Sequence, residues 1–220
     1  MKVLQSLSTS VGTKIVIGLT GLALVGFLIY HLAGNLLVFF GPDEYNGHAQ
    51  WLIDNPLIVP AELGLLAIFL VHVYKAVANY GRNLVARPQR YAVKKWAGGA
   101  SRKTLGSTTM IVSGIVTLAF VVLHLATFKY GPHYESHVPS QRDLYRLLIE
   151  VFHRRWYVVF YVVTLTIIGL HLRHGISSAL QSLGLIPEAW TRRVLAAGVV
   201  LTLVITGGFV LIPIWIYFFL

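Results

Sequence analysis

Histidines are the residues in this sequence whose positions most clearly suggest chemistry. The chain has 220 residues, of which nine are histidine and none is cysteine. Without cysteine the chain cannot form disulfides, thiolate metal sites or Cys-ligated iron–sulfur clusters of its own. Four histidines lie inside long apolar stretches: His31, His72, His124 and His171. Ionisable side chains at membrane depth cost free energy and usually mark function, so a purely structural role is disfavoured for four of them.

The stretches that contain these histidines are long enough to cross a membrane. The sequence is 56% hydrophobic and 12% charged, with a mean hydropathy of +0.70. A soluble domain of this size could not bury so much apolar surface, and continuous apolar runs favour helices over strands. We therefore expect one all-α integral membrane domain over residues 1–220. Its five transmembrane helices are predicted at about 15–40, 57–81, 105–128, 156–180 and 194–220, each near the length of about 20 residues that a span needs.

The charged segments between the spans predict the orientation. The net charge is +10, and basic residues gather at 82–103 and at 192–193, whereas the segment 43–54 is acidic. The positive-inside rule then places the N-terminus in the cytoplasm and explains the charge without nucleic-acid binding. No cleavable signal peptide is expected, because the first apolar stretch is too long for one. Asp143–Phe152 is predicted to be a short amphipathic surface helix with Leu144, Leu147, Leu148 and Val151 on its apolar face.

Helix geometry sorts the four histidines into two levels of the membrane. At a rise of about 1.5 Å per residue, His31 lies about 5 Å and His124 about 12 Å outward of the midpoints of their helices. His72 and His171 lie about 4 Å toward the cytoplasm in helices that run the opposite way. Two imidazoles from different helices at one level match the needs of a bis-His haem. The sequence thus predicts an outer haem between His31 and His124 and an inner haem between His72 and His171.

Some assignments stay open at this point. His174, one turn beyond His171, is the alternative inner ligand, although the depth of His171 matches that of His72 better. Gly34, Ala76 and Gly175 share helix faces with ligands, which suits either a flat porphyrin or ordinary packing of small residues. The remaining histidines are expected to be solvated in outer loops, where two ligands are too few for zinc: His48, His133, His137 and His153.

Three segments carry a family resemblance: "HLAGNLLVFFG" (31–41), "ELGLLAIFLVHVYKAVANYGRNLVARPQRY" (62–91) and "HLRHGISSALQSLG" (171–184). They resemble the single-subunit, five-helix dihaem cytochrome b that anchors bacterial succinate dehydrogenases and fumarate reductases, respiratory complex II. The resemblance covers nearly the whole chain and implies a multi-pass protein of the bacterial inner membrane. It implies two b haems on His31, His72, His124 and His171, with the pairing given above, and a quinone, usually menaquinone.

The resemblance also implies partners and a mechanism. A flavoprotein oxidises succinate, and an iron–sulfur subunit docks on the cytoplasmic face, where segment 82–103 is a candidate contact, although topology alone explains its charge. Electrons would pass from the inner to the outer haem and then to the quinone, with no catalytic residue in this chain. The sequence has no Gly-rich nucleotide loop, so the flavin must lie elsewhere. One fumarate reductase relative uses a glutamate for proton transfer at the position that Gly169 occupies here.

Other functions are weighed against this one. A fumarate reductase subunit would work in the reverse direction, and the sequence does not separate the two. The haem subunits of hydrogenases and formate dehydrogenases typically have four spans rather than five. A transporter or haem-free anchor with proton-relay histidines is disfavoured, because neither repeat symmetry nor broken helices with midplane charges are evident.

Overall fold

The fold is an all-α bundle of membrane-spanning length. The computed structural model describes residues 9–86 and 109–220, and within them the only β-type pairing is an isolated bridge between Glu135 and Arg142. Five helical stretches are long and apolar enough to cross a membrane, and they match the five predicted spans one for one: Ser10–Phe40, Ile58–Val85, Met110–Lys129, Arg155–Ser182 and Thr191–Phe219. The predicted all-α transmembrane architecture is confirmed.

The helices differ from the predicted bounds mainly at their ends. Their bounds are α2 Ser10–Asn35, the 3-10 turn η1 Leu36–Phe40, α3 Pro42–Asp54, α4 Ile58–Val85, α6 Met110–His124, the π-helical turn η2 Leu125–Lys129, α7 Leu144–Phe152, α8 Arg155–Ser182, η3 Glu188–Trp190 and α9 Thr191–Phe219. α2 begins before the predicted residue 15 because the Thr9 side chain accepts a hydrogen bond from the Gly12 backbone N–H, at 3.1 Å. The predicted start of the third span at residue 105 lies outside the described residues.

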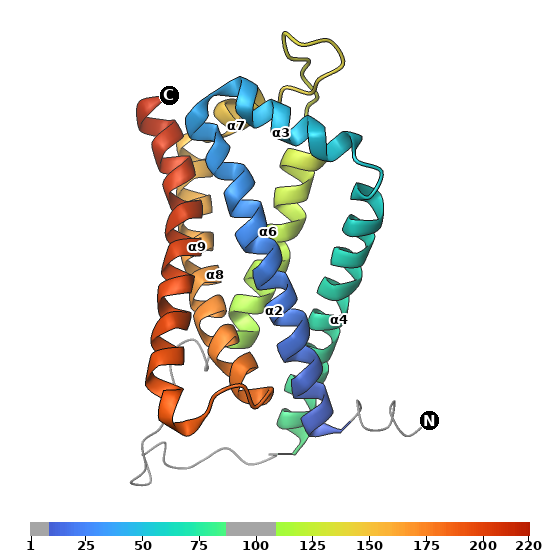
Figure 1. Ribbon diagram of the computed structural model, residues 1–220, viewed down its shortest axis with the longest axis vertical. Helices are drawn as coiled ribbons and strands as arrows, with labels where there is room; N and C mark the ends of the chain where they lie inside the picture. Colours follow the sequence, from blue (N-terminus) through green and yellow to red (C-terminus); the bar gives the residue numbers. More distant parts are fainter. Residues whose placement is uncertain (1–8, 87–108) are drawn as a thin grey trace.

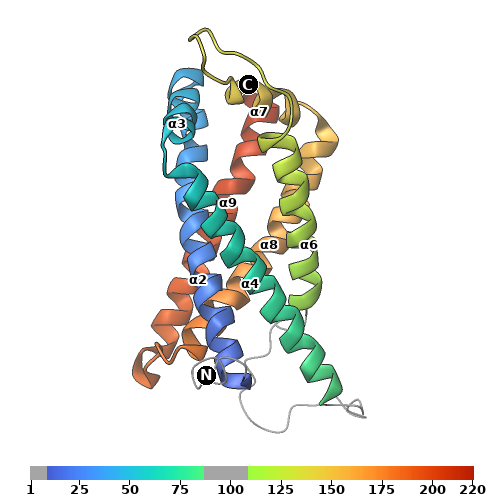
Figure 2. The ribbon, with the colours of Figure 1, turned by 90° about the vertical axis from the view of Figure 1, so that its right-hand side faces the viewer.

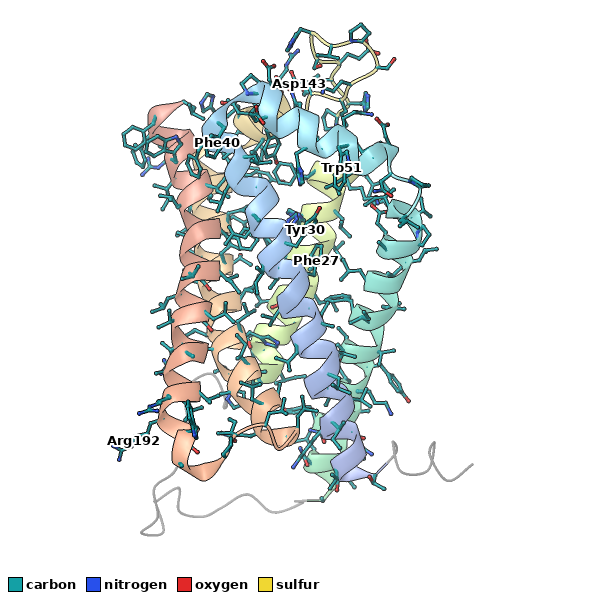
Figure 3. All side chains as sticks on the ribbon, in the orientation of Figure 1. Phe27, Tyr30, Phe40, Trp51, Asp143 and Arg192 are labelled. Atoms are coloured by element: carbon teal, nitrogen blue, oxygen red, sulfur yellow. The ribbon has the colours of Figure 1, made fainter. Side chains whose placement is uncertain are left out.

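The spans form a bundle, and α8 is the span that packs most extensively against the other described spans. α8 packs against α9, α2 and α6, and α2 also contacts α4 (Figure 1). Figure 2 shows α4 crossing one side of the bundle at an incline to α2, and no residue of α4 is buried. α3 and α7 lie over one end of the bundle, which we call the capped end. Asp143 lies at this end, and Arg192 lies at the opposite end, which we call the far end (Figure 3).

α3 corrects one prediction, because the acidic segment expected to be a loop is a helix of 13 residues. Gly41 has a φ of 103°, a left-handed conformation that turns the chain sharply before the helix. Pro42 follows at the first helical position, where its fixed φ and missing N–H fit. Asp43 and Glu44 lie in the first turn, where carboxylates stabilise the positive end of the helix dipole. The acidic residues therefore start a helix that lies across the capped end.

α7 agrees with the predicted amphipathic helix. The Asp143 side chain accepts a hydrogen bond from the Arg146 backbone N–H at 2.9 Å and so caps the helix. The predicted apolar face turns inward, and it forms a buried core with α8 and α9 at the capped end: Leu147, Leu148, Val151, Phe152, Val158, Tyr161, Leu165, Ile212 and Ile216. Burying each such large apolar side chain contributes roughly 1.5–3 kcal/mol. The side chain of Asn46 on α3 donates to Asp143 at 2.8 Å and accepts from the Tyr145 backbone N–H at 2.9 Å, which joins α3 to α7.

Candidate functional site

His31 and His124 meet near the capped end. His31 lies on α2, and His124 is the last residue of α6, directly before the π-helical turn. Their ring centroids are 5.8 Å apart and the ring planes are nearly perpendicular, at 89°. Phe27, labelled on α2 in Figure 3, stacks on His31 at 5.2 Å, and Phe120 stacks on His124 at 5.6 Å. We call these two histidines the capped-end pair.

The two rings of the capped-end pair have different hydrogen-bond partners. The Tyr161 hydroxyl on α8 lies 3.1 Å from Nδ1 of His124. Near His31, the Asn35 amide nitrogen lies 3.5 Å from Nδ1 and 3.4 Å from Nε2, and it also donates to the His31 carbonyl at 2.8 Å. Tyr45 donates to Asn35 Oδ1 at 3.3 Å, and burial raises the pKa of Tyr45 to about 12, so this phenol is neutral at physiological pH.

His72 and His171 form the second pair, which lies deeper toward the far end and which we call the far-end pair. His72 comes from α4 and His171 from α8, and both of these helices pack against α2 and α6. Nδ1 of His72 is 3.0 Å from the Thr20 hydroxyl on α2. Nδ1 of His171 is likewise 3.0 Å from the Ser113 hydroxyl on α6. The fold thus brings His31 against His124, and it places His72 against α2 and His171 against α6.

The donor set fits an iron porphyrin held by two imidazoles. In three of the four histidines the hydrogen bond to a hydroxyl uses Nδ1, which leaves Nε2 as the atom to bind a metal. Metal-bound histidines almost always hydrogen-bond through their other ring nitrogen. In the described part of the chain, no three His, Asp or Glu side chains gather as a metal site. A haem needs only two protein ligands, and two imidazoles leave iron without an open position.

The other predicted site residues behave differently from one another. His174 lies one turn beyond His171, but the Ser113 hydroxyl contacts His171. His48 lies on the helix α3 and not in a loop, and it is partly buried: a Cβ at Gly34 would be 3.0 Å from His48 Nε2. Gly34 therefore makes room for His48, whereas a Cβ at Gly175 would have no heavy atom within 4 Å. His133, His137 and His153 are exposed, as predicted.

Gly169 and the basic segment 82–103 were also singled out by the sequence. Gly169 is buried, and a Cβ at this position would be 2.7 Å from the Thr206 hydroxyl oxygen on α9, so no carboxylate side chain fits there. The basic segment 82–103 lies outside the described residues from position 87 onward. Arg82, at its start, donates to the buried Thr13 hydroxyl at 2.8 Å.

Sequence reasoning missed Thr20, Ser113 and Tyr161. Hydroxyl residues are frequent in membrane helices and usually bond to their own backbone, so their type alone gives no signal. The signal available for Thr20 and Ser113 is their spacing, since each precedes a histidine of the capped-end pair by eleven residues.

Comparison of the chain with protein-family models, with curated proteins and with solved structures finds no match.

Proposed function

We propose that this chain is the dihaem cytochrome b membrane anchor of a bacterial succinate dehydrogenase, a succinate:quinone oxidoreductase. It would lie in the inner membrane, bind a quinone, for which menaquinone is the first choice, and pass it electrons from an iron–sulfur subunit. The observation that carries the proposal is the arrangement of four histidines on four candidate spans, with His31 against His124 and with His72 and His171 each against a hydroxyl of α2 or α6. The same grouping would serve a fumarate reductase, which runs the reaction in reverse.

The four histidines would hold two haems. His31 and His124 would hold one haem, and His72 and His171 the other. When bound, the b haems supply two one-electron carriers that do not bind oxygen. The chain itself orients the imidazoles through Tyr161, Thr20 and Ser113, and it surrounds the capped-end pair with aromatic rings that exclude water.

The distribution of charge supports the orientation within the proposed complex. The far end of the bundle carries Lys14, Arg82, Arg192 and Arg193. By the positive-inside rule this end faces the cytoplasm, where the flavoprotein and iron–sulfur subunits would dock. The far-end pair is then the entry point for electrons, and the capped-end pair lies toward the opposite side of the membrane.

Haem content and histidine substitutions test the haem-binding part of the proposal. The purified chain should contain two b haems, seen in a reduced-minus-oxidised spectrum and counted by haem extraction. His31→Ala and His124→Ala should remove one and the same haem signal, and His72→Ala and His171→Ala the other. The control His153→Ala changes an exposed loop histidine and should leave both signals unchanged. A chain without haem, or four alanine variants that keep both haems, would contradict the proposal.

The assignment to succinate chemistry needs the native complex. Detergent-solubilised membranes should yield this chain together with a flavoprotein and an iron–sulfur protein, and the complex should reduce a quinone with succinate. A dihaem complex that instead oxidises hydrogen or formate and is inert to succinate and fumarate would overturn the assignment while leaving haem binding intact.

A further inference from the structure

Two hydroxyl side chains contact the far-end pair in matching ways. Thr20 on α2 approaches Nδ1 of His72, and Ser113 on α6 approaches Nδ1 of His171, both at 3.0 Å. The four residues come from four different helices. Each histidine of the pair is thus held by a neighbouring helix rather than by its own.

A glycine follows each of these hydroxyl residues, and the imidazole lies against it. A Cβ at Gly21 would be 3.3 Å from Cε1 of His72. A Cβ at Gly114 would be 3.6 Å from Cε1 of His171. Each imidazole ring therefore contacts the hydroxyl at Nδ1 and lies beside the glycine backbone at Cε1.

In both helices the hydroxyl residue lies at the same distance in sequence from the capped-end histidine of that helix. His31 follows Thr20 by eleven residues on α2, and His124 follows Ser113 by eleven residues on α6. Eleven residues make about three helical turns, so the hydroxyl and the histidine share a helix face and lie about 16 Å apart along the axis. α2 and α6 therefore each carry one histidine of the capped-end pair and one hydroxyl–glycine pair that contacts a histidine of the far-end pair.

Each of the two hydroxyls also contacts a backbone carbonyl of its own helix, which favours one direction for the bond to histidine. Thr20 donates to the Val16 carbonyl at 2.7 Å, and Ser113 donates to the Met110 carbonyl at 3.1 Å. A hydroxyl has one proton and two acceptor lone pairs. A hydroxyl that donates to a carbonyl of its own helix accepts from Nδ1–H of the histidine, and this is the tautomer that leaves the Nε2 lone pair free.

We propose that Thr20 and Ser113 are positioning residues that hold His72 and His171 as Nδ1–H tautomers with both Nε2 lone pairs free to bind haem iron. This inference rests on the proposed dihaem function. An acceptor at Nδ1–H makes an imidazole more basic and a stronger donor to iron. Stronger donation favours ferric over ferrous iron, so both hydroxyls lower the midpoint potential of the far-end haem.

Isosteric removal of the hydroxyls tests the inference. In the purified chain, Thr20→Val and Ser113→Ala should each raise the midpoint potential of the haem that His72→Ala removes, and should move its low-spin ferric EPR signal. The other haem should keep its potential and signal, which shows that the bundle is intact. Thr20→Ser retains the hydroxyl and should restore the wild-type values. The matched control is Thr202→Val, which removes a buried threonine hydroxyl that donates to the Gly198 carbonyl at 2.8 Å.

The outcomes separate this inference from the function on which it rests. Two haems in the wild type, with unchanged potential and EPR signal in Thr20→Val and Ser113→Ala, would overturn the positioning role alone. Loss of the far-end haem in Thr20→Val but not in Thr20→Ser supports the role, whereas loss in both contradicts it. A wild-type chain with no haem would overturn the proposed function and this inference together.

Discussion

Tyr161 and His124 form a ring-to-hydroxyl contact at the capped-end pair, with the phenolic oxygen 3.1 Å from Nδ1. Tyr161 is 5% exposed, and its ring packs against Phe120 and Phe152 at centroid distances of 5.0 and 4.9 Å. Tyr161 precedes His171 by ten residues on α8. One helix therefore carries a ligand for the far-end pair and the hydrogen-bond partner of a ligand at the capped end.

Tyr161→Phe removes one oxygen and keeps the ring that fills the core. Because the phenol is the hydrogen-bond partner of Nδ1 in His124, its loss should raise the midpoint potential of the capped-end haem and leave the far-end haem unchanged. Removing the partner of a buried polar atom costs about 1–3 kcal/mol, so haem should also dissociate at a lower temperature. A redox titration followed in the visible spectrum measures the first effect. Tyr157→Phe is the control, because the Tyr157 hydroxyl contacts Thr127 instead. Equal midpoint potentials in Tyr161→Phe and wild type would show that the Tyr161 hydroxyl does not tune the capped-end haem.

His174→Ala should leave both haems in place. The Ser113 hydroxyl contacts His171, and no comparable contact is found for the His174 ring within the described residues. The reduced-minus-oxidised spectrum and the haem-to-protein ratio should match the wild type, whereas His171→Ala should lose the far-end haem. If the two variants behave in the opposite way, His174 is the ligand and the pairing with His72 needs revision.

The levels of the four histidines were predictable because apolar spans fix the depth of each residue. A constant helical rise converts sequence position into height, and this alone places His31 with His124 and His72 with His171. The rotation of each helix about its axis is less accessible, because these spans are apolar on all sides. The contacts of Thr20, Ser113 and Tyr161 depend on that rotation, and so they emerge only from the fold.

α3 shows a different limit of the sequence reasoning. Its 13 residues are too short and too polar to register as a span, and its start depends on the backbone turn at Gly41. The placement of His48 over Gly34 follows from α3 and was missed with it. α7 was predictable because its apolar positions recur with the helical period and Asp143 supplies a cap.

The close approach of α8 and α9 at Gly169 predicts a coupled pair of substitutions. A Cβ at Gly169 would lie 2.7 Å from Oγ1 and 2.8 Å from Cγ2 of Thr206. Gly169→Ala should therefore destabilise the bundle by about 1–3 kcal/mol, the usual cost of overpacking. Thr206→Ala removes both of the crowded atoms, so the double variant should be more stable than the sum of the single effects predicts. Thermal unfolding in detergent, followed by circular dichroism, measures the cycle. Strict additivity would show that the helices separate instead of clashing.

The carboxylate of Glu150 predicts a pH-dependent attachment of the 130–143 loop to α7. The Tyr134 hydroxyl donates to Glu150 Oε2 at 2.7 Å, and the Arg146 side chain donates to Oε1 at 2.9 Å. These bonds, that from Tyr134 first, lower the pKa of Glu150 below its ordinary value, and the hydrogen bond to Glu150 raises the pKa of Tyr134. A depressed folded-state pKa adds stability at every pH above the unfolded value of about 4.3, and this stability is lost as the pH falls through the folded pKa.

Hydrogen exchange of the loop peptides should follow this titration. After correction for intrinsic exchange rates, protection of the Tyr134 region should be constant at neutral and mildly acidic pH and should fall in the acid range where Glu150 takes up a proton. Glu150→Gln keeps an acceptor for Tyr134 but removes the charge that holds Arg146. Its protection should be lower than that of the wild type at pH 7 and nearly independent of pH. Because the loop lies at the opposite end of the bundle from the far-end pair, the haem bound by His72 and His171 should keep its spectrum at every pH. A Glu150→Gln chain with the wild-type acid transition would assign the titration to another group.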